Sequence, residues 1–411
     1  MTKLNTSPMA DITVELSESR YDRQERVSWW DQSRLARATV LVVGAGALGN
    51  EVVKNLALVG VGNVVVVDLD VIETSNLARC IFFRAEDEGR PKALVLAERA
   101  ATVDPDIAVH GIVADIRSFG TGVALRADVI IGALDNREAR LYCNRLAARV
   151  GRSWVDGAIE ALSGVARVFA PPDTCYECTL TDADWENLAH RQSCRLLSRD
   201  DLIAGKVPTT ASTSSIIAGV EVQEAVKLLH RDRDGVRPLQ GAIVFDGANN
   251  DAYPLAYPVN PDCLAHHHFE DPVVLSSSEE GTVTAAWLAQ LVWPDGSEDQ
   301  IVVDLGDDHV IGWSCPGCGS SEPVGRPASL ISWGESVCPQ CGEYRLPDSI
   351  TSVPVSGPLA ETPLADLGVR ADEILSLRSG LVERFVWIRQ ADARLPKGWS
   401  SRTEFVAEGA L

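Results

Sequence analysis

A glycine-rich turn between a short apolar run and a helical stretch constrains this chain more than any other feature. Residues 39–43 are apolar and mostly β-branched, and Gly44-Ala-Gly46-Ala-Leu-Gly49 follows directly. Residues 51–59 then carry apolar side chains at helical spacing. The first two glycines permit a tight turn and a close approach of the backbone to a phosphate, and the third lets helix and strand pack. The pattern predicts a strand, a turn and a helix that bind a nucleotide.

Two further strands are expected downstream of this turn. Residues 63–67 read as a strand that ends at Asp68, about 20 residues after the glycines, where a ribose-binding acid sits in nucleotide-binding units. A third apolar run, 127–133, ends at Asp135. We therefore expect an α/β fold, a Rossmann-like, doubly wound and mostly parallel sheet with its ligand at the carboxyl ends of the strands. The glycines and Asp68 alone would favour an NAD-binding oxidoreductase.

A polar cluster after the second and third strands favours a different chemistry. A hydride-transfer enzyme has no need of such a cluster. An adenylating enzyme does, because charge builds on the α-phosphate and pyrophosphate when a carboxylate attacks, and Arg, Lys and magnesium must neutralise it. The cluster consists of Asp68, Asp70, Asn76, Arg79, Lys92 and Asp135.

Five motifs together identify a family. In chain order they are R-Y-D-R-Q, G-A-G-A-L-G, D-L-D-V-I-E-T-S-N-L-A-R, G-R-P-K and L-D-N-R-E-A-R, between residues 20 and 140. On these motifs the chain resembles, over roughly residues 20–270, the ubiquitin-activating enzymes and their bacterial relatives, the adenylyltransferases of the thiamin and molybdopterin sulfur carriers.

The resemblance implies ATP and magnesium as cofactors and the C-terminal glycine carboxylate of a ubiquitin-like protein as the group that is adenylated. Arg23 would act on the phosphates as an arginine finger, in many relatives from the other subunit of a dimer, and the sequence leaves action in cis or in trans open. We expect a homodimer of bacterial type. The resemblance places Gly44, Gly46 and Gly49 at the phosphates, Asp68 and Asp70 around the ribose, Asn76, Arg79 and Lys92 at the phosphates, and Asp135 at magnesium.

Cys175 and Cys178 open a first expected zinc site. The chain has ten cysteines, and six of them fall in C-x-x-C pairs, which in a large chain suits thiolate metal sites more than disulfides. Cys263 and His266 are the expected partners, since two short knuckles can converge after a long separation. The neighbouring histidines at 267 and 268 leave open which imidazole is the ligand (His266, His267 or His268), and a metal-free pair is the alternative.

A second zinc site is expected from two C-P-x-C-G knuckles. Cys315 and Cys318 form the first, and Cys338 and Cys341 the second. Glycine after each pair permits the tight turn around a metal, so the spacing predicts a zinc ribbon. Four cysteine ligands leave no open position, so we expect a structural or docking role; disulfides are the alternative reading.

Cys194 is the candidate nucleophile. It lies in a polar segment, 182–206, where the activating enzymes keep the cysteine that accepts the adenylated tail as a thioester. His190, Arg191 and Arg195 would favour its thiolate. An ordinary free cysteine is the alternative. Cys80 and Cys143 stand in apolar contexts and are expected to be packing residues.

The organisation expected from the sequence has four parts. Residues 1–19 read as a disordered leader, and 20–270 as the adenylation domain. Residues 271–395 read as a smaller α+β, ubiquitin-fold-like domain with the zinc ribbon, 313–345, inserted, and 396–411 as a tail. A stretch from Leu364 onward resembles the end of the ubiquitin-fold domain with which activating enzymes recruit a conjugating enzyme.

The composition of the chain limits the classes of partner that it can bind. The net charge of −21 repels a phosphate backbone, so nucleic acid is excluded as a partner. No run approaches the roughly 20 apolar residues that span a bilayer, and the first residues lack a signal-peptide core, so we expect no membrane and a cytoplasmic protein.

The favoured function is activation of a ubiquitin-like protein, with a thioester on Cys194 and transfer to a conjugating enzyme. The alternatives are a sulfur-carrier adenylyltransferase, in which a sulfur donor resolves the adenylate, and a non-enzymatic zinc-bearing scaffold whose nucleotide site has decayed.

Overall fold

A computed structural model describes residues 19–171, 174–186, 208–275, 283–294, 300–389 and 394–396. Residues 1–18 of the expected leader, most of the expected tail, and the part of segment 182–206 that holds Cys194 lie outside the described residues. Within the described ranges, no helix has both the length and the apolar character needed to cross a membrane.

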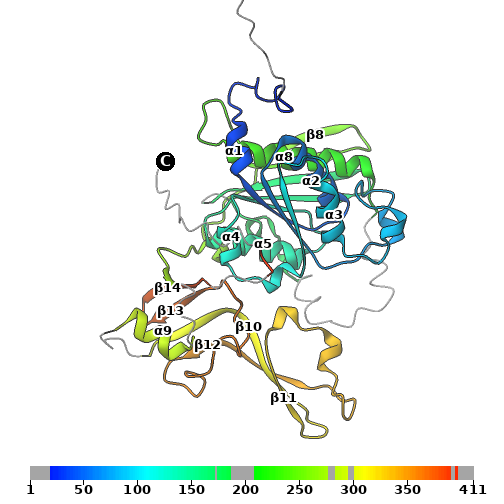
Figure 1. The fold of residues 1–411 in the computed structure, drawn as a ribbon. Coiled ribbons are helices and arrows are strands. Elements are labelled where there is room, and N and C mark those ends of the chain that lie inside the picture. The colour runs from blue at the N-terminus through cyan, green and yellow to red at the C-terminus, as the bar shows by residue number, and fades with distance from the viewer. Residues whose placement is uncertain are drawn as a thin grey trace, which may run out of the picture.

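The larger of two sheets has eight strands in the order β3-β2-β1-β4-β5-β6-β7-β8 (Figure 1). Its first five strands are parallel and its last three antiparallel. This confirms the mostly parallel α/β sheet. The strands are β1 (Thr39–Val43), β2 (Asn63–Asp68), β3 (Ala108–Val113), β4 (Val129–Gly132), β5 (Trp154–Glu160), β6 (Ser163–Phe169), β7 (Gly241–Asp246) and β8 (Asp251–Leu255).

Helices cover both faces of this sheet because its central strands are apolar on both sides. In β1, Val40 and Val42 pack into one core while Leu41 and Val43 pack into the other, as the alternation of a buried strand requires. Figure 1 shows the two helical layers. The first core holds α1 (Gln32–Arg37), α2 (Ala47–Val59), α3 (Lys92–Ala100) and α8 (Ala211–Leu229), and the second holds α4 (Gly122–Leu125) and α5 (Arg137–Arg149).

The second sheet forms a smaller unit, in the lower half of Figure 1. Its order is β11-β10-β13-β14-β9, with β12 also paired to β10, and Leu288 of its helix packs in the core. The ubiquitin fold expected for this unit stays a prediction. Its elements are β9 (Val273–Leu275), α9 (Ala285–Val292), β10 (Val302–Ser314), β11 (Ser321–Pro327), β12 (Leu346–Pro354), β13 (Ile374–Ser379) and β14 (Val382–Ile388).

Buried polar contacts join the two units. Arg126 Nε, from the larger unit, donates to Asp372 Oδ2 at 2.6 Å, and within the smaller unit Trp387 Nε1 donates to Asp372 Oδ1 at 2.9 Å. The backbone amide of Thr121 donates to Glu373 Oε1 at 2.9 Å. All five side chains are less than 10% exposed, so these bonds form out of contact with bulk water and fix the smaller unit against α4.

Candidate functional site

The turn between β1 and α2 has the geometry of a phosphate-binding turn. Gly44 has φ of 104°, and a Cβ on it would lie 2.2 Å from the carbonyl oxygen of Ala133. A Cβ on Gly49 would lie 2.0 Å from the carbonyl oxygen of Gly44, whereas one on Gly46 would meet nothing within 4 Å. Gly46 is the N-cap of α2, and no side chain caps it. The start of α2 is therefore open at Gly46, where free backbone amides favour an anion.

Asp68 ends β2 and organises this turn. Its Oδ2 accepts from the amide of Ala45 at 2.7 Å, and its Oδ1 accepts from the amide of Asp70 at 2.7 Å. Burial raises the pKa of Asp68, although these backbone hydrogen bonds and the charge of Lys92 oppose the shift. Asp68 thus links the glycine turn to the loop that follows β2.

Lys92, the first residue of α3, faces three acids. Its Nζ lies 2.8 Å from Asp70 Oδ2, and its side chain is mostly buried. Burial by itself would lower the pKa of Lys92, but the hydrogen bond to Asp70 and the charges of Asp68, Asp70 and Asp135 outweigh it and raise the pKa. The lysine therefore stays charged at the carboxyl ends of the parallel strands.

Asp135 and Arg79 are free to meet a ligand. Asp135 is exposed just beyond the end of β4, and the side-chain amide of Asn136 donates to its Oδ1 at 3.2 Å. Arg79 is half-buried, and its side chain forms no hydrogen bond or ion pair with any other residue that the structure describes. Asn76, by contrast, is buried, and its Oδ1 accepts from the amide of Glu73 at 3.0 Å. The phosphate contact expected of Asn76 stays a prediction.

Arg23 lies far from the glycine turn of its own chain. The neighbouring Gln24 donates from Nε2 to the carbonyl of Val59, the last residue of α2, at 3.2 Å. The turn at Gly46 is at the other end of this 13-residue helix, about 20 Å away. Arg23 is exposed and has no partner within the described part of the chain, so it points to solvent rather than to the site in the same subunit.

The first cysteine cluster comes together as expected. Cys175 Sγ lies 3.7 Å from both Cys178 Sγ and Cys263 Sγ, and Cys178 Sγ lies 3.2 Å from His266 Nε2. These separations exceed a disulfide bond of about 2.05 Å. They match the edge of a tetrahedron with metal–sulfur bonds of about 2.3 Å, and three cysteines with one histidine form a donor set that zinc prefers.

The structure also separates the three adjacent histidines. His267 Nε2 lies 3.0 Å from Glu383 Oε2 on β14, and His268 Nδ1 bonds the carbonyl of Ala148 at 2.5 Å. Only His266 of the three is in the group of ligand atoms, all of which lie within 4.8 Å of one another.

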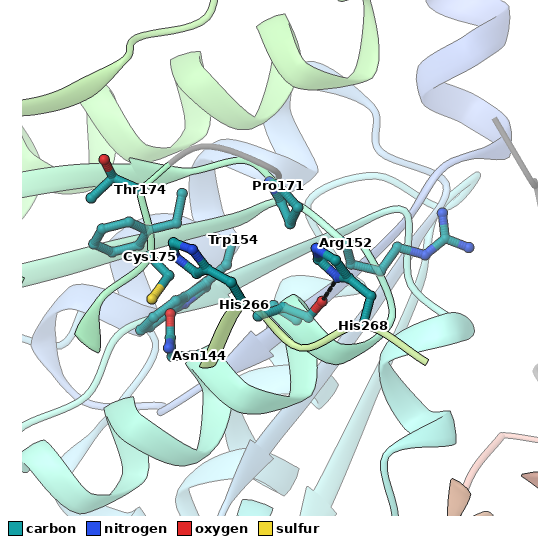
Figure 2. A pocket seen from close by; sticks show the side chains of 11 residues that line it. Asn144, Arg152, Trp154, Pro171, Thr174, Cys175, His266 and His268 are labelled. Atoms are coloured by element: carbon teal, nitrogen blue, oxygen red, sulfur yellow. Dashed lines mark hydrogen bonds between the residues drawn. The ribbon is translucent and has the colours of Figure 1, made fainter. Parts of the chain in front are cut away.

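A small pocket lies beside this cluster. Figure 2 shows Cys175 and His266 on its wall together with Trp154 and Asn144. The cavity is about 20 Å³, roughly the space of one water molecule. It is far too small for a nucleotide, so the glycine turn remains the candidate nucleotide site.

The second cluster forms the expected pair of knuckles. Cys315 Sγ lies 3.5 Å from Cys341 Sγ, and Cys318 Sγ lies 3.7 Å from Cys338 Sγ. The glycines that follow the two pairs, at 319 and 342, have φ of 72° and 79°. This left-handed conformation is what a tight knuckle requires and what glycine adopts without strain. The four sulfurs fit a structural zinc ion.

The remaining described cysteines are not nucleophiles. Cys80 and Cys143 are 3% and 0% exposed, which confirms the packing role expected for them. Burial raises the pKa of Cys80 to about 11, and burial also raises the pKa of Cys143. Of the ten cysteines, seven belong to the two clusters and these two are buried. Cys194, outside the described residues, is the one left.

The two described ends of the segment that contains Cys194 lie beside residues that follow β4 and β5. Arg137, two residues after Asp135, donates from Nη1 to Asp184 Oδ1 at 2.5 Å. On the return, Thr209 bridges Ala161 at the end of β5. The segment thus leaves and rejoins the fold at the edge of the sheet where the polar cluster lies.

A buried charge cluster near Asp135 was missed in the sequence. Asp156, in β5, accepts from Arg140 Nε at 2.9 Å and from Arg167 Nη1 at 2.7 Å, and it is 0% exposed. Glu221 of α8 is also 0% exposed. The sequence did offer one sign of this cluster, an acid (Asp156) among apolar residues of a strand. Its partners could not be predicted, because they come from separate elements that only the fold brings together.

Comparison with known proteins agrees with this geometry. The model of the ThiF family matches residues 21–265. The chain is similar to the SAMP-activating enzyme E1 of Haloferax volcanii, with 32% identity over 266 residues, which is 61% of this chain and 91% of that protein. It is also similar to the sulfur carrier protein adenylyltransferase of Thermus thermophilus, with 38% identity over 39% of this chain and 62% of that protein.

Two further similarities complete the comparison. The sulfur carrier protein ThiS adenylyltransferase of Escherichia coli is 30% identical over 56% of this chain and 88% of its own length. Among solved structures, the E. coli MccB complex with MccA-N7isoASN superimposes with a TM-score of 0.51 at 22% identity, over 61% of this chain and 75% of that one. That likeness shows the fold alone.

Proposed function

This chain belongs to the ThiF family, and on that premise we propose that it uses ATP to adenylate the C-terminal carboxylate of a small ubiquitin-like or sulfur-carrier protein. The observation that carries the proposal is the polar cluster at one edge of the sheet. This cluster lies at the carboxyl ends of the parallel strands: the open start of α2, the charged Lys92, the unpaired side chain of Arg79, and Asp135. The relatives bear names of both activating enzymes and carrier adenylyltransferases.

The described residues suit the charge that this reaction develops. The carrier carboxylate attacks the α-phosphorus of ATP, and the bond to the pyrophosphate oxygen breaks. Lys92 and Arg79 are placed to neutralise the phosphates, and backbone amides at Gly46 to bind them. Asp135 supplies the hard carboxylate oxygens that magnesium prefers, and magnesium bound there would neutralise charge on the phosphates.

Arg23 supports a homodimer. Because it lies at the far end of α2 from its own glycine turn, it is available to the site of a second copy of the chain and not to its own. We therefore assign the arginine finger to action in trans, which requires two chains to pair.

An exposed apolar edge offers a docking surface for the carrier protein. Every residue of β8, the last strand of the sheet, is exposed, and Tyr253 and Leu255 are 46% and 41% exposed. Exposed apolar residues on a sheet edge favour contact with a protein partner. We place the carrier body against β7 and β8, with its tail directed along the sheet toward Asp135.

The finer proposal is that Cys194 accepts the activated tail. Its thiolate attacks the acyl carbonyl of the adenylate, the acyl–phosphate bond breaks, and AMP leaves. By sequence, Cys194 is about eight residues from Glu186, a reach of up to roughly 28 Å, and the two described cysteines outside the clusters are buried. A conjugating enzyme would then receive the acyl group. In the alternative, a sulfur donor resolves the adenylate and Cys194 forms no adduct.

Incubation with ATP, magnesium and a ubiquitin-like protein ending in Gly-Gly, followed by intact-mass spectrometry without reductant, tests this proposal. We expect a covalent adduct that dithiothreitol removes. Cys194→Ser should abolish the thiol-labile adduct and keep ATP–pyrophosphate exchange, because no thiol takes part in adenylation. Cys143→Ala is the matched control and should keep both.

Two results would revise the proposal. A thiol-labile adduct that persists in Cys194→Ser would place the nucleophile elsewhere. Active exchange with no adduct in the unmodified enzyme would favour the sulfur-carrier alternative.

A further inference from the structure

The loop that carries Asp135 is held from behind by a buried arginine. Arg140, one turn into α5, donates from Nη2 to the carbonyl of Leu134, the residue directly before Asp135. The same guanidinium donates from Nε to Asp156 Oδ1 at 2.9 Å and from Nη2 to the carbonyl of Gly157 at 3.1 Å. One side chain therefore ties the loop after β4 to the neighbouring strand β5.

Burial makes these bonds rigid. Asp156 is 0% exposed and Arg140 is 9% exposed, so water does not compete for the guanidinium. Charge-assisted hydrogen bonds in such surroundings are stronger than at the surface. On the other side of Asp135, Asn136 caps α5 by accepting from the amide of Ala139 at 2.8 Å. The loop is thus fixed both before and after Asp135, whose own side chain stays exposed.

We propose that Arg140, oriented by Asp156, is a positioning residue that holds the Leu134–Asp135 loop so that the Asp135 carboxylate can bind the magnesium of the bound nucleotide. The inference rests on the proposed function. Outer residues that orient a metal ligand usually change metal affinity by 10- to 100-fold when they are altered. Arg140 and Asp156 are not expected to touch the nucleotide themselves.

Arg167 provides a matched control within the same cluster. It donates from Nη1 to the other oxygen of Asp156 at 2.7 Å, and its Nε lies 3.4 Å from the Tyr257 hydroxyl. It is a charged partner of the same carboxylate, but it has no contact with the Leu134 carbonyl among its described hydrogen bonds. A purely structural role for the cluster would make Arg140 and Arg167 equivalent, whereas a positioning role separates them.

Lysine substitutions separate the effect of the guanidinium geometry from the effect of its positive charge. Arg140→Lys keeps the positive charge, but one ammonium cannot reproduce a guanidinium that reaches Asp156 with Nε and Leu134 with Nη2. Arg167→Lys makes the same chemical change on the control side. Asp156→Asn is a second variant that weakens the hold on Arg140 while keeping the shape of the side chain.

The experiment is ATP binding by isothermal titration calorimetry across a magnesium titration and in EDTA, with thermal melting of every variant. We expect Arg140→Lys to raise the half-saturating magnesium concentration about tenfold or more and to change ATP affinity in EDTA by less than about twofold. Asp156→Asn should act in the same direction. In Arg167→Lys the half-saturating magnesium concentration should stay within about twofold of that of the unmodified protein, even if its melting temperature falls as much as that of Arg140→Lys.

The outcomes separate the inference from the proposed function. Two outcomes would overturn the positioning role alone. One is an equal change in magnesium dependence in Arg140→Lys and Arg167→Lys. The other is an unchanged magnesium dependence in Arg140→Lys and Asp156→Asn when both variants are folded. Failure of the unmodified protein to bind ATP in magnesium would overturn the proposed function, and the inference with it.

Discussion

Glu221 of α8 lies in surroundings that disfavour a charged carboxylate. It is 0% exposed, and neither of its carboxylate oxygens has a hydrogen-bond partner among the described residues. Burial, and secondarily the charge of Asp156, raise its pKa well above the usual value, while Arg140 opposes the shift. An unpartnered buried carboxylate is costly as an anion, so the native protein favours its protonated form.

The raised pKa of Glu221 predicts a pH-dependent stability. Above the ordinary glutamate pKa of 4.5, the unfolded chain releases this proton while the native protein retains it. The free energy of unfolding therefore decreases as pH rises from there through the raised pKa. Glu221→Gln removes this titration. The free energy of unfolding of the variant, measured by urea denaturation, should therefore increase relative to that of the unmodified protein between pH 5 and about pH 8. A constant difference across that range would show that Glu221 is not protonated in the native protein.

The two cysteine clusters act at the scale of elements. The first joins the loop after β6 to the segment after β8, and the second joins the end of β10 to the loop before β12. In both cases a bound metal would stabilise short loops that have little apolar packing of their own. Each cluster is a separate set of ligand atoms, so the two ions should be lost independently.

Metal analysis should return two zinc ions per chain. Cys315→Ser should remove one ion and leave ATP–pyrophosphate exchange intact, because the knuckles lie in the smaller unit. Cys175→Ser should remove the other ion and lower the melting temperature of the larger unit. One zinc ion in the unmodified protein, or loss of both in Cys315→Ser, would be inconsistent with two independent sites.

Elements that depend on neighbouring residues could be predicted from the sequence, whereas pairings between residues far apart in the chain could not. The turn at Gly44 and the strand ending at Asp68 depend on neighbouring residues and lie where expected. In the smaller unit, β12 pairs with residues 302–304 and again with residues 309–314, and this makes them one bulged strand, β10, which neighbouring residues alone do not specify. The pairing of Asp156 with two arginines required the fold, since each partner comes from a different element.

The whole molecule depends on the contact between its two units. Asp372 accepts from Arg126 and Trp387, and its backbone carbonyl accepts from the amide of Gly122 at 2.8 Å. An apolar group that includes Phe385 of β14 and Leu125 of α4 packs beside these bonds. The smaller unit is therefore held against the helices α4 and α5, and α5 begins beside Asp135.

Asp372→Ala should destabilise the molecule strongly. It removes the buried carboxylate to which a buried guanidinium donates, a change that usually costs about 3 to 5 kcal/mol. Asp304→Ala is the matched control, because Asp304 and its partner Arg378 are partly exposed, at 29% and 54%, and the substitution should cost less than about 1 kcal/mol. Equal effects of the two variants on the free energy of unfolding would show that the Asp372 contact does not hold the units together.

The most direct test of adenylation is ATP–pyrophosphate exchange with a ubiquitin-like protein that ends in a free glycine carboxylate. We predict exchange by the unmodified protein and a loss on the order of 100-fold or more in Asp135→Ala, with an unchanged melting temperature because Asp135 is exposed. Removal of the carrier protein should also abolish exchange. Undiminished exchange in folded Asp135→Ala would contradict the site, and exchange that does not depend on the carrier carboxylate would contradict the account as a whole.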